Sequence, residues 1–275
     1  MTLLFELQGL MFEHRFRPNH AMGQNFIISE SLLNRMIEVA ELKKTDIVLE
    51  IGCGTGFLTR KLLEHCKVVG FEKDEKMVEI LKKNFGENKN FTLIEEDFLS
   101  SKPPKFNKIV SLPPYGISTD LAISVFHHAP QKAVLVLQKE FVEKLTAEPG
   151  FWDYNYVSVL TSLRYTPSTP IRNLQPRCFY PSPDSFSSLV VLDAKKKQPK
   201  IKNEDDFVYF LKTVFRYKNK NLSNAIRNAV PDIAKRMKIH KEKALETVLT
   251  SGLAEDKVSV IEPEIFAEIF TRISQ

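Results

Sequence analysis

Glycines at alternate positions mark the first segment of the chain that could do chemistry. Gly52, Gly54 and Gly56 follow the apolar run Ile47–Leu49 and precede the helix-like stretch Phe57–Leu63. A strand, a glycine-rich turn and a helix in that order bring bare backbone against a ligand, because glycine lacks a Cβ and tolerates positive φ. The dinucleotide fingerprint G-x-G-x-x-G requires a glycine where this chain has Phe57, so the spacing argues against a dinucleotide site.

Carboxylates follow the next two predicted strands. Glu72 ends the second strand, 20 residues after Gly52, and Asp97 and Phe98 follow the third strand. The Glu72 carboxylate can accept hydrogen bonds from both ribose hydroxyls of an adenosine. Asp97 can accept from an adenine amino group while the Phe98 ring packs on the base. With the glycine loop, these side chains predict a cofactor that contains adenosine.

A proline-rich loop, Ser111-Leu112-Pro113-Pro114-Tyr115, follows the fourth predicted strand. It resembles the N-L-P-Y and N/D/S-P-P-Y loops of methyltransferases that act on adenine N6. The N6 lone pair is conjugated into the ring, so acceptors aimed at its N–H groups favour the pyramidal amine that attacks a methyl group. The resemblance makes the Pro113 carbonyl one acceptor, while Pro114 stiffens the loop and Tyr115 stacks on an extruded base.

The loop departs from that pattern at Leu112, which stands where the related loops have Asn, and an aliphatic side chain offers no acceptor. Three interpretations stay open. The site is weak or inactive, Ser111 substitutes through a shifted register, or one backbone acceptor suffices.

Two further segments resemble one family. Gly23-Gln24-Asn25-Phe26-Ile27 resembles the G-Q-N-F-L signature, and Phe179–Ser187 resembles F-x-P-x-P-x-V-x-S with Ser185 in place of Val. With the three loops above, in this order, they identify the chain from about Pro18 onward as similar to KsgA-type ribosomal RNA small-subunit adenine N6,N6-dimethyltransferases. The resemblance implies that Gln24, Asn25 and Ile27 cover the methionine end of S-adenosylmethionine. It gives Leu112 a place in both the catalytic and the cofactor-binding set, and makes Phe179 the second aromatic face for the target base.

The family resemblance also implies an activity and partners. We expect methyl transfer from S-adenosyl-L-methionine, leaving S-adenosyl-L-homocysteine, to two adjacent adenosines near the 3′ end of small-subunit rRNA. The substrate would be a pre-ribosomal small subunit, and the protein, acting as a monomer, would also serve in assembly. Alternatives are a large-subunit rRNA adenine methyltransferase, a DNA adenine methylase, a protein-glutamine methylase, a non-catalytic RNA-binding assembly factor or a transcription factor of the same ancestry.

Alternating elements predict an α/β fold with a Rossmann-like, mostly parallel sheet covered by helices on both faces. Strands are expected in the segments 47–52, 68–71, 91–94, 108–112, 133–137, 157–164 and 188–192. Helices are expected between them, at 56–65, 74–83, 119–127 and 139–145, after a first helix that includes Leu32, Met36 and Ala40. In such sheets ligands bind beyond the carboxyl ends of the strands, where the motifs lie.

Charge separates the end of the chain from the rest. Residues 194–242 carry 14 lysines and arginines against 5 aspartates and glutamates, whereas the whole chain has a net charge of +5. We therefore predict a catalytic domain at 1–193, a linker at 194–199 and a small, basic, helical RNA-binding domain at 200–275. Arg216, Lys218, Lys220 and Arg227 would contact phosphates.

Cysteine spacing and the lengths of the apolar runs limit which classes of protein this chain can belong to. The three cysteines, Cys53, Cys66 and Cys178, have no C-x-x-C spacing, which indicates neither a disulfide framework nor a metal site. The sequence shows no secretory signal and no apolar run long enough to span a bilayer, so we expect a cytoplasmic protein without membrane contact.

Overall fold

The computed structural model describes residues 2–250 and 252–274, and its internal contacts divide the chain into two compact units. The first unit comprises residues 1–121, 129–142 and 167–194, and the second comprises 122–128, 143–166 and 195–275. The second unit thus takes in two segments that precede the basic tail. The functional boundary at 194–199 stays a prediction.

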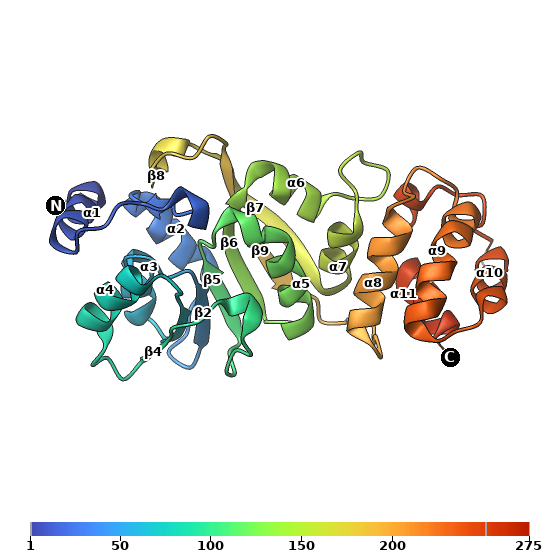
Figure 1. The fold of residues 1–275 in the computed structure, drawn as a ribbon, viewed down its shortest axis with the longest axis horizontal. Coiled ribbons are helices and arrows are strands. Elements are labelled where there is room, and N and C mark those ends of the chain that lie inside the picture. Colours follow the sequence, from blue (N-terminus) through green and yellow to red (C-terminus); the bar gives the residue numbers. More distant parts are fainter. Residues whose placement is uncertain (1, 251, 275) are drawn as a thin grey trace. The chain divides into compact units, whose positions relative to one another are not determined.

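A seven-stranded sheet organises the first unit (Figure 1). Its strands, in order across the sheet, are β4 (Phe91–Ile94), β3 (Lys67–Phe71), β2 (Ile47–Ile51), β5 (Lys108–Ser111), β6 (Lys132–Gln138), β9 (Ser187–Ala194) and β7 (Tyr165–Leu174). The strands from β4 to β6 are parallel, and β9 runs antiparallel to β6. The chain enters this sheet at β2, continues outward through β3 to β4 and returns to β5 on the other side of β2. The β2–β5 boundary is therefore a topological switch point. The α/β prediction is confirmed.

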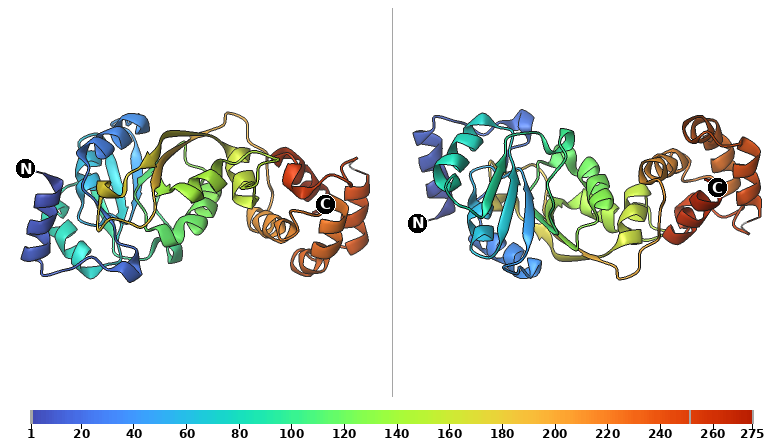
Figure 2. Two further views of the ribbon diagram at one scale, coloured as in Figure 1. Left: turned by 90° about the horizontal axis from the view of Figure 1, so that it is seen from above. Right: turned by 90° about the horizontal axis from the view of Figure 1, so that it is seen from below.

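The central strands are buried on both faces of the sheet, because neighbouring residues of a strand point to opposite faces and both sets are covered. Val48, Val68 and Val110 face one core, and their neighbours Leu49 and Ile109 are equally inaccessible. Helices that pack over the first unit are α1 (Leu3–Glu13), α2 (Glu30–Ala40), α3 (Phe57–Leu63) and α4 (Glu75–Phe85). Figure 2 shows the parallel strands side by side among these helices.

Shorter elements complete the connections. Strands β1 (Phe26–Ile27) and β8 (Phe179–Tyr180) form a small antiparallel sheet. Single 3-10 turns lie at η1 (His20–Met22), η2 (Phe98–Ser100), η3 (Tyr115–Ile117), η4 (Pro176–Cys178) and η5 (Val258–Val260). The helices α5 (Ser118–His128) and α6 (Lys139–Thr146) begin in the first unit and end in the second.

The strand predicted at 157–164 is wrong, because this segment forms helix α7 (Tyr156–Arg164). Asn155 caps this helix. Its side-chain oxygen accepts a hydrogen bond from the backbone amide of Val157 at 2.9 Å, and its backbone amide donates to Ser158 Oγ. The β-branched residues that suggested a strand are buried on several sides of the helix instead. Packing and the capping box therefore override the local β propensity.

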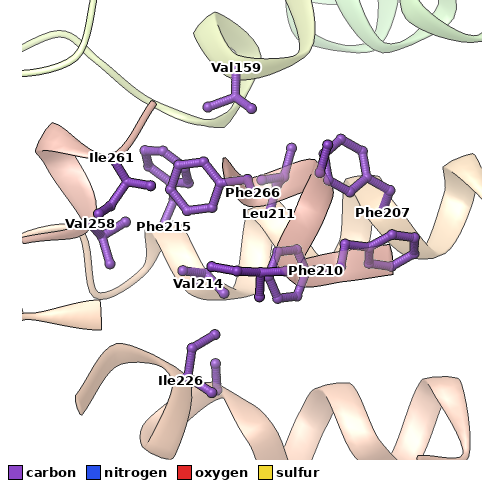
Figure 3. Packing of buried hydrophobic residues seen from close by; sticks show 14 of the residues in the cluster. Val159, Phe207, Phe210, Leu211, Val214, Phe215, Ile226, Val258, Ile261 and Phe266 are labelled. Carbon is purple, nitrogen blue, oxygen red and sulfur yellow. The ribbon is translucent and has the colours of Figure 1, made fainter. Parts of the chain in front are cut away.

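The second unit is helical, with α8 (Glu204–Phe215), α9 (Leu222–Met237), α10 (Lys241–Leu249) and α11 (Pro263–Ile273) after the linker. These four helices lie together in Figures 1 and 2. Figure 3 shows their shared core, where Phe207 and Phe215 of α8 face Phe266 and the α7 residue Val159. The aromatic pair Phe215 and Phe266 has ring centres 5.4 Å apart. No described helix is long and apolar enough to cross a membrane.

Close packing against α4 explains why a glycine stands at position 56. Its φ is +83°, and a Cβ there would lie 2.5 Å from the Phe85 ring. We expect Gly56→Ala to lower the free energy of unfolding by about 2–4 kcal/mol, through left-handed strain and overpacking. Gly9→Ala, in the open middle of α1, should instead raise it by roughly 0.5–1 kcal/mol. Urea unfolding of both variants checks the prediction, and equal effects would contradict it.

A buried carboxyl lies in the central strand. Glu50 is 1% exposed and accepts a hydrogen bond from Thr59 Oγ1 at 2.7 Å. Burial raises its pKa from 4.5 to about 8. Between these values the folded state keeps a proton that the unfolded state has released, so stability falls as pH rises through this window.

We therefore expect Glu50→Gln, which fixes the neutral form, to gain stability relative to the parent protein as pH rises from about 5 to 8. Urea unfolding at both pH values measures the difference. A stability difference that is the same at both pH values would show that Glu50 does not titrate in this window.

Candidate active site

A pocket of about 510 Å³ lies at the carboxyl ends of the central parallel strands. Its wall takes residues that directly follow β2, β3, β4 and β5, together with the segment 21–26. A pocket of this size suits a small-molecule cofactor. The motifs that sequence spacing singled out therefore meet where an open parallel sheet binds its ligands.

The glycine loop forms one wall of this pocket. Gly52 and Gly54 line it, with φ of +75° and +54°. A Cβ on Gly54 would come within 3.3 Å of the Phe26 ring, and a Cβ on Gly52 within 3.2 Å of Pro114. Gly56 does not line the pocket, because it caps α3 against α4. A side chain at Gly52 or Gly54 would therefore crowd Pro114 or Phe26, which also line the pocket.

The carboxylate of Glu72 fastens this loop. It is 8% exposed, and Oε2 accepts from the Gly54 amide at 2.8 Å. Oε1 accepts from the amides of Lys73 and Asp74 at 2.9 and 3.0 Å. Burial raises the pKa of Glu72, and these backbone donors oppose the rise. Since two carboxylate oxygens offer about four acceptor positions, one remains for a ligand on this wall.

Asp97 and Phe98 follow β4, the strand next to β3 in the sheet, and both line the pocket. Asp97 accepts from the Leu99 amide at 3.0 Å and from Lys73 Nζ at 2.8 Å. The hydrogen bond from Lys73 lowers the pKa of the Asp97 carboxyl, which keeps it an acceptor. The Phe98 ring packs edge-on against Phe71, with ring centres 5.4 Å apart.

The segment before β1 closes another side. Gln24 and Asn25 line the pocket, and Gln24 Nε2 donates to Asp74 Oδ2 at 2.8 Å, which ties the segment to the start of α4. Ile27 is buried in the core and does not line the pocket. Its assigned contact with the cofactor stays a prediction.

The proline-rich loop faces the glycine loop. Leu112, Pro113, Pro114 and Tyr115 all line the pocket. Among the described residues, no hydrogen bond reaches the Pro113 carbonyl, so this acceptor is available to a substrate. Leu112 is half-buried against the apolar core, and its side chain offers no acceptor.

Ser111 does not lie on the pocket wall. It is fully buried, and its hydroxyl donates to the Ile51 carbonyl at 2.7 Å and accepts from the Ile51 amide at 3.2 Å. The hydroxyl thus joins β5 to β2. Because both interactions are internal to the sheet, this conformation leaves Leu112 at the position of the missing acceptor.

Tyr115 has a partner that sequence reasoning missed. Its hydroxyl lies 2.6 Å from Ser187 Oγ at the start of β9, and burial raises its pKa. Lys73 and Asp74 were also missed, although they hold Asp97 and Gln24 in place. The detectable signal for the last two was their position directly after Glu72. The Tyr115–Ser187 contact joins residues 72 positions apart and leaves no local signal.

Phe179 lies outside the pocket lining. It is 1% exposed and pairs with Ile27 across the β1–β8 sheet. This pairing brings the segments around Gln24 and Phe179 together. A second aromatic face for a target base stays a prediction, since the ring is covered here.

The predicted RNA-binding cations belong to the second unit, around the end of α8 and on α9. Arg216 pairs with Asp232 at 3.2 Å, and Arg227 donates to Asn224. Lys218 donates to the Trp152 carbonyl at 2.8 Å, and Lys220 lies 5.9 Å from the centre of the Tyr217 ring. Their contact with RNA stays a prediction.

Known proteins align with this chain over most of its length. The chain is 34% identical over 272 residues to a probable ribosomal RNA small subunit methyltransferase A from Methanopyrus kandleri, covering 97% of this chain and 96% of that protein. A protein of the same description from Pyrococcus abyssi is 33% identical, covering 94% and 93% of the two chains.

Solved structures share the fold. A dimethyladenosine transferase from Plasmodium falciparum superposes with a TM-score of 0.76 and 28% identity, covering 89% of this chain and 95% of that one. The 23S rRNA methyltransferase ErmE gives a TM-score of 0.64 at 23% identity, covering 91% and 100%. The sheet is thus that of the class I S-adenosylmethionine-dependent methyltransferases. Residues 15–262 match the family described as ribosomal RNA adenine dimethylase, and the chain belongs to that family.

Proposed function

We propose that this protein transfers methyl groups from S-adenosylmethionine to the N6 atoms of two adjacent adenosines near the 3′ end of small-subunit rRNA. It acts in the cytoplasm, as a monomer, on a pre-ribosomal small subunit. The observation that carries the proposal is the meeting of Gly54, Glu72, Asp97 and the loop Leu112–Tyr115 around one pocket.

The pocket fits the methyl donor by its shape and donor set. Gly52 and Gly54 let the glycine loop pack closely against Pro114 and Phe26 on the pocket wall, and Glu72 keeps one acceptor position free. Glu72 would hold the ribose, Asp97 and Phe98 the adenine, and Gln24 and Asn25 the methionine end. S-adenosylmethionine supplies an electrophilic methyl group on a positively charged sulfur. When the methyl group is transferred, this sulfur leaves as the neutral thioether of S-adenosylhomocysteine.

The protein's own contribution is to position the amine and exclude water. The Pro113 carbonyl accepts from an N–H of adenine N6 and favours the pyramidal amine. The Tyr115 ring supports the extruded base, and its bond to Ser187 holds the ring in place. An adenine must leave its stack to enter such a pocket, which favours unpaired RNA.

Leu112 supports a second candidate function, an RNA-binding assembly factor that binds the cofactor but transfers methyl groups weakly or not at all. A leucine on the pocket wall removes one acceptor from the amine site. Loss of one oriented hydrogen-bond partner costs roughly 10²–10³ in rate at comparable sites.

Methyl transfer to small ribosomal subunits that lack the modification separates the two functions. Labelled S-adenosylmethionine is the donor, and the digested rRNA is analysed for mono- and dimethyladenosine. Dimethyladenosine is the result expected of the enzyme. Absence of transfer while S-adenosylhomocysteine still binds would overturn the proposal in favour of the assembly factor.

In the same assay we expect Leu112→Asn to raise the single-turnover rate by at least about tenfold, because the amide oxygen restores an acceptor. Leu112→Val is the matched control, since it changes the volume and adds no acceptor. Equal rates for the two variants would show that the Pro113 carbonyl suffices.

A further inference from the structure

Two large aromatic residues lie in the loop between α6 and α7, whose backbone Figure 1 draws. Phe151 is 61% exposed and Trp152 is 79% exposed. Leaving side chains of this size in water forgoes the free energy that their burial would supply. Adjacent exposed aromatics are therefore typical of a contact surface.

The loop that carries them is anchored on both sides. The Gly150 amide donates to the Ser259 carbonyl at 2.8 Å. Tyr154 is fully buried, and its hydroxyl donates to the Ile261 carbonyl at 2.8 Å. Asn155 Nδ2 donates to the Asp153 carbonyl at 2.6 Å. Phe151 and Trp152 thus point outward from a fixed backbone, so a partner that packs on them loses little loop entropy.

Lysines adjoin this aromatic pair. Lys218 Nζ donates to the Trp152 carbonyl at 2.8 Å, and the Lys218 carbonyl accepts from the Ser259 amide at 3.1 Å. Lys220 is exposed and lies two residues further along the same turn. We call Phe151, Trp152, Lys218 and Lys220 the aromatic–basic platform.

The chemistry of the platform favours single-stranded nucleic acid over protein. Aromatic rings stack on the flat face of any base, and lysines contact the neighbouring phosphates. Protein interfaces share the enrichment in Trp and Phe but are depleted of Lys. Glu148 and Asp153 lie in the same loop and offset part of the positive charge, so stacking has to supply much of the affinity.

We propose that the aromatic–basic platform binds unpaired bases of rRNA by stacking on Phe151 and Trp152, with Lys218 and Lys220 on the flanking phosphates. The identity of the RNA rests on the proposed function. None of the four residues lines the cofactor pocket, so this contact is separate from the adenosine to be methylated.

The chain offers a direct reporter, because Trp152 is its only tryptophan. Titration of the full-length protein with a short single-stranded RNA should quench its fluorescence, with the same midpoint as the anisotropy of the labelled RNA. A duplex of the same sequence should quench less, since its bases are already stacked. Binding by anisotropy without quenching would overturn the proposal.

Variants separate stacking from general charge. Trp152→Ala should weaken the affinity for single-stranded RNA by about tenfold, and Trp152→Phe, which keeps a ring, should largely restore it. Lys220→Gln should reduce the slope of log affinity against log salt by about one. Phe12→Ala is the control, because Phe12 is 88% exposed on α1. Equal losses for Phe12→Ala and Trp152→Ala would contradict the platform.

The methyl transfer assay keeps this proposal distinct from the proposed function. Quenching by RNA without methyl transfer would support the platform and overturn the enzyme. Methyl transfer to small subunits without quenching by RNA would leave the enzyme intact and overturn the platform.

Discussion

One buried carboxylate organises the candidate active site. The Glu72 oxygens accept from the backbone amides of Gly54, Lys73 and Asp74. These amides belong to the loop after β2 and to the residues that lead into α4, so a single side chain fixes two neighbouring strand ends. Charged acceptors make strong hydrogen bonds to backbone donors, and burial gives each of them greater weight. This arrangement fixes the pocket wall that the glycine loop and the end of β3 form.

The other walls of the pocket contact the wall that Glu72 organises. Asp74 holds Gln24, Lys73 holds Asp97, and Pro114 approaches the places where Gly23 and Gly52 lack a Cβ. The proline-rich loop therefore packs directly on the glycine loop and on the segment before β1. Ser111 strengthens this arrangement by bonding to Ile51 in the neighbouring strand. The Leu112 side chain takes part in none of these contacts, so a change at this position alters the pocket wall without removing them.

Local patterns predicted the parts of this site that each lie directly after a strand. Gly52, Gly54, Glu72, Asp97 and Tyr115 could be found because parallel strands bring their carboxyl ends to one edge. Contacts between distant segments could not, and they include the Tyr115–Ser187 bond and the burial of Phe179 against Ile27. Helix α7 was mistaken for a strand because its β-branched residues are selected by packing on several sides.

The most direct test of the role of Glu72 is calorimetric titration of S-adenosylhomocysteine into the parent protein, Glu72→Gln and the matched control Glu75→Gln. Glutamine keeps the shape but cannot accept all three amide bonds and a ribose hydroxyl together. We expect Glu72→Gln to lose at least about 100-fold in affinity, the equivalent of two charge-assisted hydrogen bonds, while Glu75→Gln binds as the parent does. Equal affinity for all three folded proteins would contradict a pocket organised by the Glu72 carboxylate.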